Sequence, residues 1–382
     1  MSATMMTTLL GGLAPRQFLE EYWQKKPFLV RQAVPGFSGL LTRADLFDLA
    51  CDQDVESRLI RYRPTAPQTS TVDHGPQKKN QLRGKHEPWT VLVQGLNLWV
   101  PEADALLHRF NFIPQARLDD LMVSYAIDGG GVGPHFDNYD VFLLQGMGRR
   151  RWQIADQADR TLVEGAPLKL LRNFQPVHDW VLEPGDMLYL PPHWAHNGIA
   201  IGECTTYSIG FKSPTAQELA YGFCNWLSEQ PRLQEQEIYA DPDLELQDNS
   251  AEISAAMIDR VEHMLSMVRW TRADVAAFLG AYLTEPKPNI FFDPCGSVPH
   301  DDFVRGFQSL GCRLDPRTLL LWSAESGFHL NGEPLACASA DHVTLARLAH
   351  HRQLDADTPL SPALWALFHD WYEDGFLHFQ EK

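Results

Sequence analysis

One glycine-rich stretch, residues 129–152, constrains the fold of this chain more than any other part of its sequence. It reads GGGVGPHFDNYDVFLLQGMGRRRW, so His135 and Asp137 are separated by one residue. Side chains two positions apart on a β-strand point to the same side of a sheet. An apolar strand is predicted over 141–144, and a Gly-Met-Gly turn then leads into three arginines. We therefore expect a strand end that presents an imidazole and a carboxylate together.

A second stretch, residues 184–198, supplies further imidazoles. It reads PGDMLYLPPHWAHNG and contains His193 and His196. Alone, a His-x-Asp pair is usually a histidine hydrogen-bonded to an aspartate, but two histidines and one carboxylate form the ligand set of non-haem Fe(II) oxygenases. Such a set leaves positions on the metal open for a cosubstrate and O2. His196 begins a predicted strand and can project inward, so we favour it over His193, which lies in the preceding turn.

The three arginines suggest a partner for an acidic cosubstrate. Strand alternation places Arg150 on one face and its two neighbours on the other. Three arginines on a strand are ordinarily a solvated edge, but here they lie between an apolar strand and a tryptophan. We choose Arg150 as the inward cation because arginine can hold a carboxylate with two parallel hydrogen bonds. Ser208 and Tyr207, on a later predicted strand, are alternative donors to the same acid.

Composition excludes several classes of function. The 382 residues carry a net charge of −17, which argues against nonspecific nucleic-acid binding by the whole chain and permits a basic partner. The six cysteines include no Cys-x-x-Cys pair, so we expect free thiols in a reducing compartment rather than disulfides or a zinc site. No apolar run approaches the roughly 18 residues of a membrane span, and no signal peptide is evident. We therefore expect a cytoplasmic protein without membrane contact.

The pattern of predicted elements divides the chain into three parts. Many short strands with Gly and Pro turns, typical of a barrel or sandwich, give way to helices near residue 214. Over 253–268 apolar residues recur about every four positions, and we favour a dimer interface for this helical face over packing against the barrel. The last part mixes strands and helices like a winged-helix module, but its acidic balance argues against DNA binding. The predicted parts are 1–213, 214–285 and 286–382.

Four segments of the sequence resemble a known family. They are GGGVGPHFDNYDVFLLQGMGRRRW, PGDMLYLPPHWAHNG, the following TYSIGFKSP, and FLEEYWQKKPFLVR near the N-terminus. Together they are similar to the bacterial ribosomal oxygenases of the JmjC class, within the cupin superfamily. Within that class they look most like those that hydroxylate an arginine of protein sixteen of the large ribosomal subunit. The order of barrel, helices and tail is similar as well.

The resemblance implies a structure and an activity. The fold would be α+β, with a double-stranded β-helix (JmjC or cupin jelly roll), a helical dimerisation region and a C-terminal winged-helix-like domain. Fe(II) would be held by His135, Asp137 and His196, and 2-oxoglutarate would pair with Arg150. Asp128, just before the glycine run, would bind the target guanidinium, although a turn-forming aspartate is an equal alternative. The implied substrate is a basic ribosomal protein, which suits an acidic enzyme.

Three rival functions remain open at this point. The hydroxylated residue could be a histidine, as in related ribosomal oxygenases. JmjC-type demethylation would need a methylated substrate. A non-catalytic cupin-like scaffold could keep the barrel without turnover, because a fold alone does not establish an activity.

Overall fold

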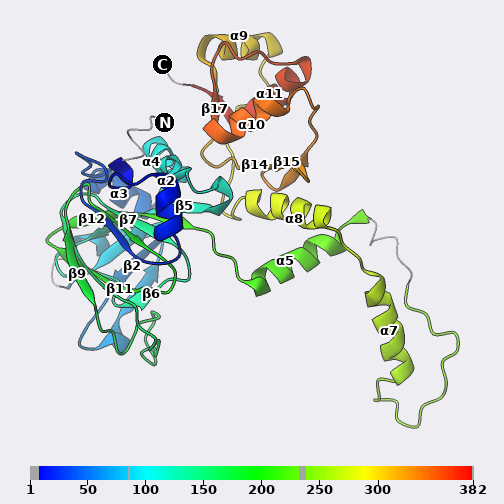
Figure 1. Ribbon diagram of the computed structural model, residues 1–382, viewed down its shortest axis with the longest axis horizontal. Helices are drawn as coiled ribbons and strands as arrows, with labels where there is room; N and C mark the ends of the chain where they lie inside the picture. The colour runs from blue at the N-terminus through cyan, green and yellow to red at the C-terminus, as the bar shows by residue number, and fades with distance from the viewer. Residues whose placement is uncertain (1–7, 85–86, 232–237, 381–382) are drawn as a thin grey trace. The chain divides into compact units, whose positions relative to one another are not determined.

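Residues 8–84, 87–231 and 238–380 are described by a computed structural model (Figure 1). The chain divides into two compact units, Met1–Ser213 and Pro214–Lys382. The division falls where the sequence changes from strands to helices. A further boundary near residue 285 stays a prediction.

Two antiparallel β-sheets form the centre of the first unit. The larger sheet has eight strands, in the order β1 (Phe28–Val30), β10 (Met187–Leu190), β7 (Val141–Gln145), β12 (Cys204–Phe211), β5 (Leu118–Ala126), β4 (Thr90–Val93), β2 (Ser57–Arg61) and β3 (Thr71–His74). The smaller sheet has four, in the order β6 (His135–Phe136), β11 (Ala195–Ile201), β8 (Arg149–Ala155) and β9 (His178–Leu182). From β5 to β12 the chain passes repeatedly between the sheets, which brings the two His-containing stretches of the sequence together.

The larger sheet has two chemically different faces because side chains alternate along its strands. On β12, Tyr207 and Ile209 belong to the main apolar core. That core also takes residues from three helices, α2 (Pro15–Glu21), α3 (Arg43–Ala50) and α4 (Pro101–Leu107). Thr206 and Ser208, on the opposite face of β12, line a cavity instead. Each large apolar side chain buried in the core contributes about 1.5–3 kcal/mol, so the core side of the sheet is held rigidly beneath the cavity.

Local sequence signals account for the helix starts. A threonine before a helical segment predicts an N-cap, and Thr42 indeed forms a capping box with Asp45 at the beginning of α3. Pro15 and Pro101 occupy first-turn positions of α2 and α4, where the missing N–H costs nothing. The sequence predicts a helix over 103–110. In the structure α4 begins earlier, at Pro101, and gives way at His108 to a 3₁₀ turn, η4 (His108–Phe110).

A polar composition rich in Pro, Gly, Gln and Lys predicts a surface loop over residues 64–88, and this prediction is wrong in part. Within it lie the edge strand β3 and two 3₁₀ turns, η1 (Pro67–Thr69) and η2 (Gln81–Arg83). β3 pairs with β2 from Arg58 opposite His74 to Arg61 opposite Thr71. Its residues are largely polar and half-exposed, so its sequence lacks the apolar alternation that would predict a strand. The strand is defined by its backbone pairing with β2.

The second unit contains six described helices and two small sheets. The helices are α5 (Ala216–Ser228), α7 (Ala255–Met267), α8 (Arg272–Thr284), α9 (His300–Leu310), α10 (His342–His351) and α11 (Pro362–Glu373). One sheet is β17 (Gln353–Leu354), β13 (Cys312–Leu314) and β18 (Leu377–Phe379), and the other is β14 (Leu320–Ser323), β15 (Gly327–Leu330) and β16 (Glu333–Leu335). The Asn331-Gly332 pair predicts a hairpin turn, and in the structure it joins β15 to β16, with both residues at positive φ. α9, α10 and α11 pack with these strands around a separate apolar core.

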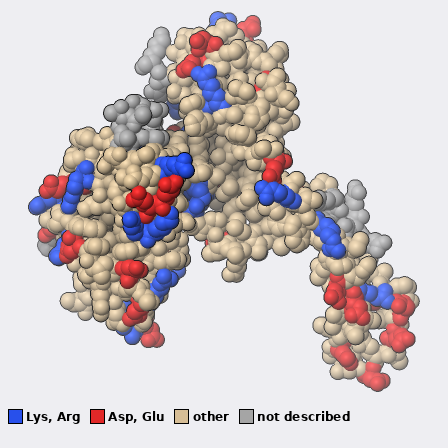
Figure 2. All heavy atoms as spheres, in the orientation of Figure 1, with Lys and Arg blue, Asp and Glu red and all other residues tan. Residues whose placement is uncertain are grey.

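Helix α7 carries the apolar face that the sequence predicts, and none of its residues is buried in the described chain. Met257, Val261 and Leu265 are all exposed. The chain just before α7 is strongly acidic and exposed, and red side chains gather in this region in Figure 2. The use of α7 as a dimer interface stays a prediction. Among the described helices, none combines the length and the apolar character that crossing a membrane requires.

Candidate metal centre and its pocket

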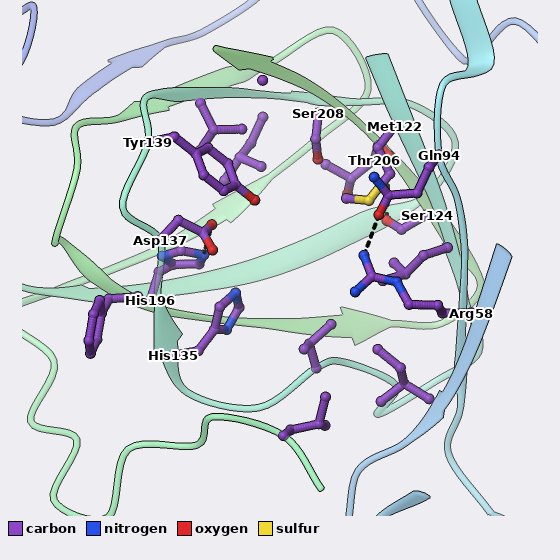
Figure 3. A pocket seen from close by; sticks show the side chains of 18 of the residues that line it. Arg58, Gln94, Met122, Ser124, His135, Asp137, Tyr139, His196, Thr206 and Ser208 are labelled. Carbon is purple, nitrogen blue, oxygen red and sulfur yellow. Dashed lines mark hydrogen bonds and ion pairs between the residues drawn. The ribbon is translucent and has the colours of Figure 1, made fainter. Parts of the chain in front are cut away.

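Three side chains from the two His-containing stretches meet between the sheets (Figure 3). His135 lies on β6, Asp137 follows that strand, and His196 lies on β11. β6 and β11 pair directly, with His196 opposite His135, and the imidazole ring centroids are 4.2 Å apart. One ligand atom of each residue lies within 4.8 Å of the other two. The arrangement therefore offers two nitrogens and one oxygen to a single cation.

Hydrogen bonds to the backbone orient both imidazoles. His135 Nδ1 lies 2.8 Å from the carbonyl oxygen of Gly133, and His196 Nδ1 lies 3.0 Å from that of Trp194. A carbonyl oxygen only accepts, so each Nδ1 carries the proton and each Nε2 keeps its lone pair. His196 Nε2 faces Asp137 Oδ2 at 3.6 Å. Both histidines are thus held in the tautomer that binds a metal through Nε2.

The structure shows which of the two histidines in the second stretch belongs to the cluster. His196 is 3% exposed, and its pKa lies well below the usual value because burial, and then the neighbouring His135, disfavour the charged form. A neutral imidazole is the form that binds a metal. The His193 side chain is exposed, and its backbone has φ 70°. The contact of His193 with the cluster is made by its backbone N–H, which donates to the Asp137 carbonyl over 2.8 Å. The cluster therefore contains His196 and not His193.

Arg150 is the inward member of the three arginines. It is 3% exposed on β8, whereas Arg149 and Arg151 are exposed on the other face. Within the described chain, its Nε and Nη2 atoms are buried without a hydrogen-bond partner. These two N–H groups lie on the same edge of the guanidinium, where they can bind both oxygens of one carboxylate. Burying them unpaired is unfavourable, so their environment suits a bound anion.

A cavity of about 500 Å³ connects the three ligands with Arg150. Ser208 and Thr206 line it from β12. Tyr207 lies on the opposite face of that strand, where its hydroxyl oxygen accepts from the backbone N–H of Leu40 over 2.7 Å. Of the two hydroxyl donors considered from sequence, the structure therefore brings Ser208 to the cavity and directs Tyr207 into the core.

The far wall of the cavity is polar, and the sequence did not single it out (Figure 3). Arg58 on β2 donates to Gln94, which follows β4. The Gln94 amide lies 3.5 Å from Asp120 on β5, and Asp120 also accepts from the Gly95 N–H over 2.9 Å. The available signal was the alternation of Asp120, Met122 and Ser124 with the buried Leu121, Val123 and Tyr125 on β5, and the first three line the cavity. Tyr139 also lines the cavity, beside the metal ligands.

A short hairpin, residues 161–172, closes another side of the cavity. Thr161 and Arg172 pair at its base, and Leu171 donates to the Pro134 carbonyl over 2.8 Å. Leu170 packs over Gly133 so closely that a Cβ on Gly133 would lie 2.6 Å from it. Gly133 also has φ +89°, so glycine is required here by both backbone and space. The hairpin thus contacts the chain immediately before the ligand His135.

Asp128 is not brought to this cavity. Its carboxylate is exposed and accepts a 2.7 Å hydrogen bond from the backbone N–H of Gly202. That contact joins two turns at an end of the sheets. Its predicted role in holding a substrate guanidinium stays a prediction, and among the described residues the buried acid that faces the cavity is Asp120.

Comparisons with known proteins identify both units. Residues 105–219 match the JmjC domain, and residues 267–378 match the ROXA-like winged helix. The chain is 36% identical over 249 residues to the ribosomal protein uL16 3-hydroxylase of Escherichia coli, covering 65% of each chain. It is 40% identical over 221 residues to a probable ribosomal oxygenase of Haemophilus influenzae, covering 56% of this chain and 54% of the relative. The chain therefore spans less than two thirds of the length of either curated relative.

Solved structures extend the similarity to nearly the whole chain. The ribosomal oxygenase YcfD from Escherichia coli, in complex with cobalt and 2-oxoglutarate, superposes with a TM-score of 0.79 at 28% sequence identity. The superposition covers 97% of this chain and 99% of that one. The fold and the ligand cluster define a JmjC-class jelly roll joined to a winged helix, which confirms the fold class expected from the sequence. The chain therefore carries a JmjC domain and a ROXA-like winged helix, and it resembles the bacterial ribosomal oxygenase YcfD over nearly its whole length.

Proposed function

We propose that this protein is an Fe(II)- and 2-oxoglutarate-dependent oxygenase that hydroxylates an arginine side chain of the large-subunit ribosomal protein uL16. One observation supports this more than any other: three metal-ligand atoms and the unpartnered edge of Arg150 face the same cavity of the described chain. The name of the Escherichia coli relative supplies the substrate protein.

The donor set fits the metal and the cosubstrate. Two neutral imidazole nitrogens and one carboxylate suit Fe(II), and the carboxylate of Asp137 offsets part of its charge. When bound, Fe(II) with 2-oxoglutarate and O2 supplies the oxidising power that no side chain of the protein has. His135, Asp137 and His196 would hold the metal, and Arg150 would bind a carboxylate of the cosubstrate. Ser208 lines the same cavity and can add a hydroxyl donor.

The wall around Asp120 suits a basic target side chain. A buried carboxylate that faces the cavity can accept hydrogen bonds from a guanidinium, and Asp119 adds a second acid at the same wall. Met122 and Leu92 supply apolar surface for the methylene groups of an arginine side chain. The protein would therefore select its target by orienting it. The acids of this wall hold the guanidinium of the target arginine, and one of its methylene carbons then faces the metal ligands.

The net charge and the free cysteines agree with a cytoplasmic enzyme that acts on a basic protein. Net charge is −17, which favours encounter with a cationic ribosomal protein. All six cysteines are free thiols, as a reducing compartment allows.

The proposal is tested by mass spectrometry. The purified protein is incubated with Fe(II), 2-oxoglutarate and isolated uL16, and a gain of about 16 Da, one oxygen atom, is expected on one arginine. The Asp137→Ala variant is the control, because it lacks a ligand but keeps the sheets. A gain located on histidine would favour the histidine hydroxylase. Absence of both product and succinate would favour a non-catalytic scaffold.

A further inference from the structure

We infer that Asp140 is a positioning residue for the metal centre: its buried carboxylate fixes the turn that carries the ligand Asp137. The inference rests on the proposed function in one respect, namely that His135, Asp137 and His196 bind a metal. Asp140 does not line the cavity and is not itself a ligand, so its effect would be transmitted through the backbone of residues 137–140.

The turn that Asp140 ends is the crossing between the two sheets. β6 ends at Phe136 in the smaller sheet, and β7 begins at Val141 in the larger one. The ligand Asp137 therefore lies at one end of the turn and Asp140 at the other. Alternation at the start of β7 sends Tyr139 and Val141 toward the cavity. Asp140 consequently points the other way, toward the core side of the larger sheet.

Three donors from separate parts of the chain converge on the Asp140 carboxylate, which is 0% exposed. The Tyr189 hydroxyl donates to Oδ1 over 2.6 Å. The Gln24 side-chain amide donates to Oδ2 over 2.9 Å, and Arg117 Nη2 approaches the same oxygen at 3.4 Å. Both oxygens are thus engaged, and three elements distant in sequence fix the position of this carboxylate.

The donors are themselves held by the core. Trp23 stacks on the Tyr189 ring at 5.7 Å, and the backbone N–H of Gln24 donates to the Tyr189 hydroxyl over 2.8 Å. Arg117 Nε donates to the carbonyl of Lys212 over 2.8 Å. The Asp140 carbonyl also accepts from the Phe211 N–H over 3.2 Å. These contacts tie one end of the ligand turn to rigid packing, whereas residues 138 and 139 between the ends are exposed.

Replacing this aspartate by asparagine would break the pattern of hydrogen bonds without changing the size of the side chain. The three side-chain groups around Asp140 all donate, and a carboxylate only accepts. The amide nitrogen of an asparagine would instead present N–H groups to donors such as those of Gln24 and Arg117. Groups that orient metal ligands from outside typically change metal affinity by about 10–100-fold when lost. We therefore expect Asp140→Asn to weaken metal binding, although it removes no ligand.

The matched control is Asp186, a second buried carboxylate at the opposite end of β10. It accepts from Arg31 and from the backbone N–H groups of Gln32 and Glu183. β10 pairs with β7 so that Met187 lies opposite Leu144, far along the strand from the ligand turn. Asp186→Asn should therefore remove buried hydrogen bonds and lower thermal stability but leave metal affinity unchanged.

The experiment measures Co(II) binding to the full-length metal-free protein, by titration followed through the Co(II) absorption bands, together with the thermal midpoint of each variant. We expect the Co(II) dissociation constant to rise about tenfold or more in Asp140→Asn and to stay within about twofold of wild type in Asp186→Asn. Tyr189→Phe, which removes one donor and keeps the ring, should give a smaller increase. This variant also provides the test if Asp140→Asn does not fold.

Two results would overturn the inference, and they are distinguishable. If Asp140→Asn and Tyr189→Phe both bind Co(II) like wild type, then Asp140 stabilises the fold only and the proposed function is unaffected. If wild type itself binds no Co(II), the metal centre fails and this inference fails with it.

Discussion

Replacing Arg150 by methionine should separate cosubstrate binding from metal binding and from stability. Two charge-assisted hydrogen bonds to a carboxylate contribute together about 3–6 kcal/mol. At about 1.4 kcal/mol for each tenfold change, the 2-oxoglutarate requirement should rise at least roughly 100-fold. Metal affinity should change little, because Arg150 is not in the ligand cluster.

The effect on folding should be small, and this is the unusual part of the prediction. In the absence of cosubstrate, Nε and Nη2 of Arg150 are buried without partners in the described chain, which costs about 1–3 kcal/mol. The guanidinium also lies 5.8 Å from the Trp152 ring, a contact of about 0.5–2 kcal/mol that methionine gives up. Because the two effects oppose each other, the thermal midpoint should stay within a few degrees of wild type.

The assay titrates 2-oxoglutarate against succinate release and, separately, against the metal-loaded protein by calorimetry. Arg149→Met is the matched control, since it removes the same charge from the exposed face of the same strand. A variant in which the 2-oxoglutarate requirement is unchanged, or in which Arg149→Met raises it equally, would refute the role of Arg150. A large fall in the thermal midpoint would show that Arg150 is a structural cation.

Two further predictions concern the substrate wall and pH. Asp120→Asn should raise the KM for a uL16 peptide by roughly tenfold or more, because a hydrogen bond to a charged group is lost. Asp128→Asn should leave this KM unchanged. The opposite result would favour Asp128 as the residue that binds the substrate. The lowered pKa of buried His196 predicts that the unfolded chain binds a proton the folded chain does not, so metal-free protein loses stability as pH falls below about 6.5. Denaturant titrations over a range of pH from about 4 to about 8 should show this loss, and His196→Gln should flatten it.

The parts of the site that depend on one strand were predictable from sequence. The one-residue gap between His135 and Asp137 fixes their common direction, and alternation in three successive arginines selects Arg150 without knowledge of the fold. His196 could be preferred to His193 because proline and glycine mark the turn before it. In each case a local rule was sufficient, and the structure places the side chains so selected around one cavity.

Features that depend on contacts between distant strands were not predictable. Ser208 and Tyr207 are adjacent, and only the pairing of β12 with its neighbours shows which one faces the cavity. Arg58, Gln94 and Asp120 come from three parts of the sheet whose order the sequence does not state. Asp140 resembles any aspartate before a strand, because its partners lie up to 116 positions away.

The hairpin over residues 161–172 separates the shape of the cavity from the side chains that are clustered as metal ligands. It supplies one wall of the cavity, yet it contributes none of the three clustered metal ligands and is joined to the chain before them by a main-chain hydrogen bond at Pro134. Insertions or replacements in it would reshape that wall without removing a clustered ligand. Exchanging this one segment would therefore change which side chains fit the cavity and leave the three clustered residues in place.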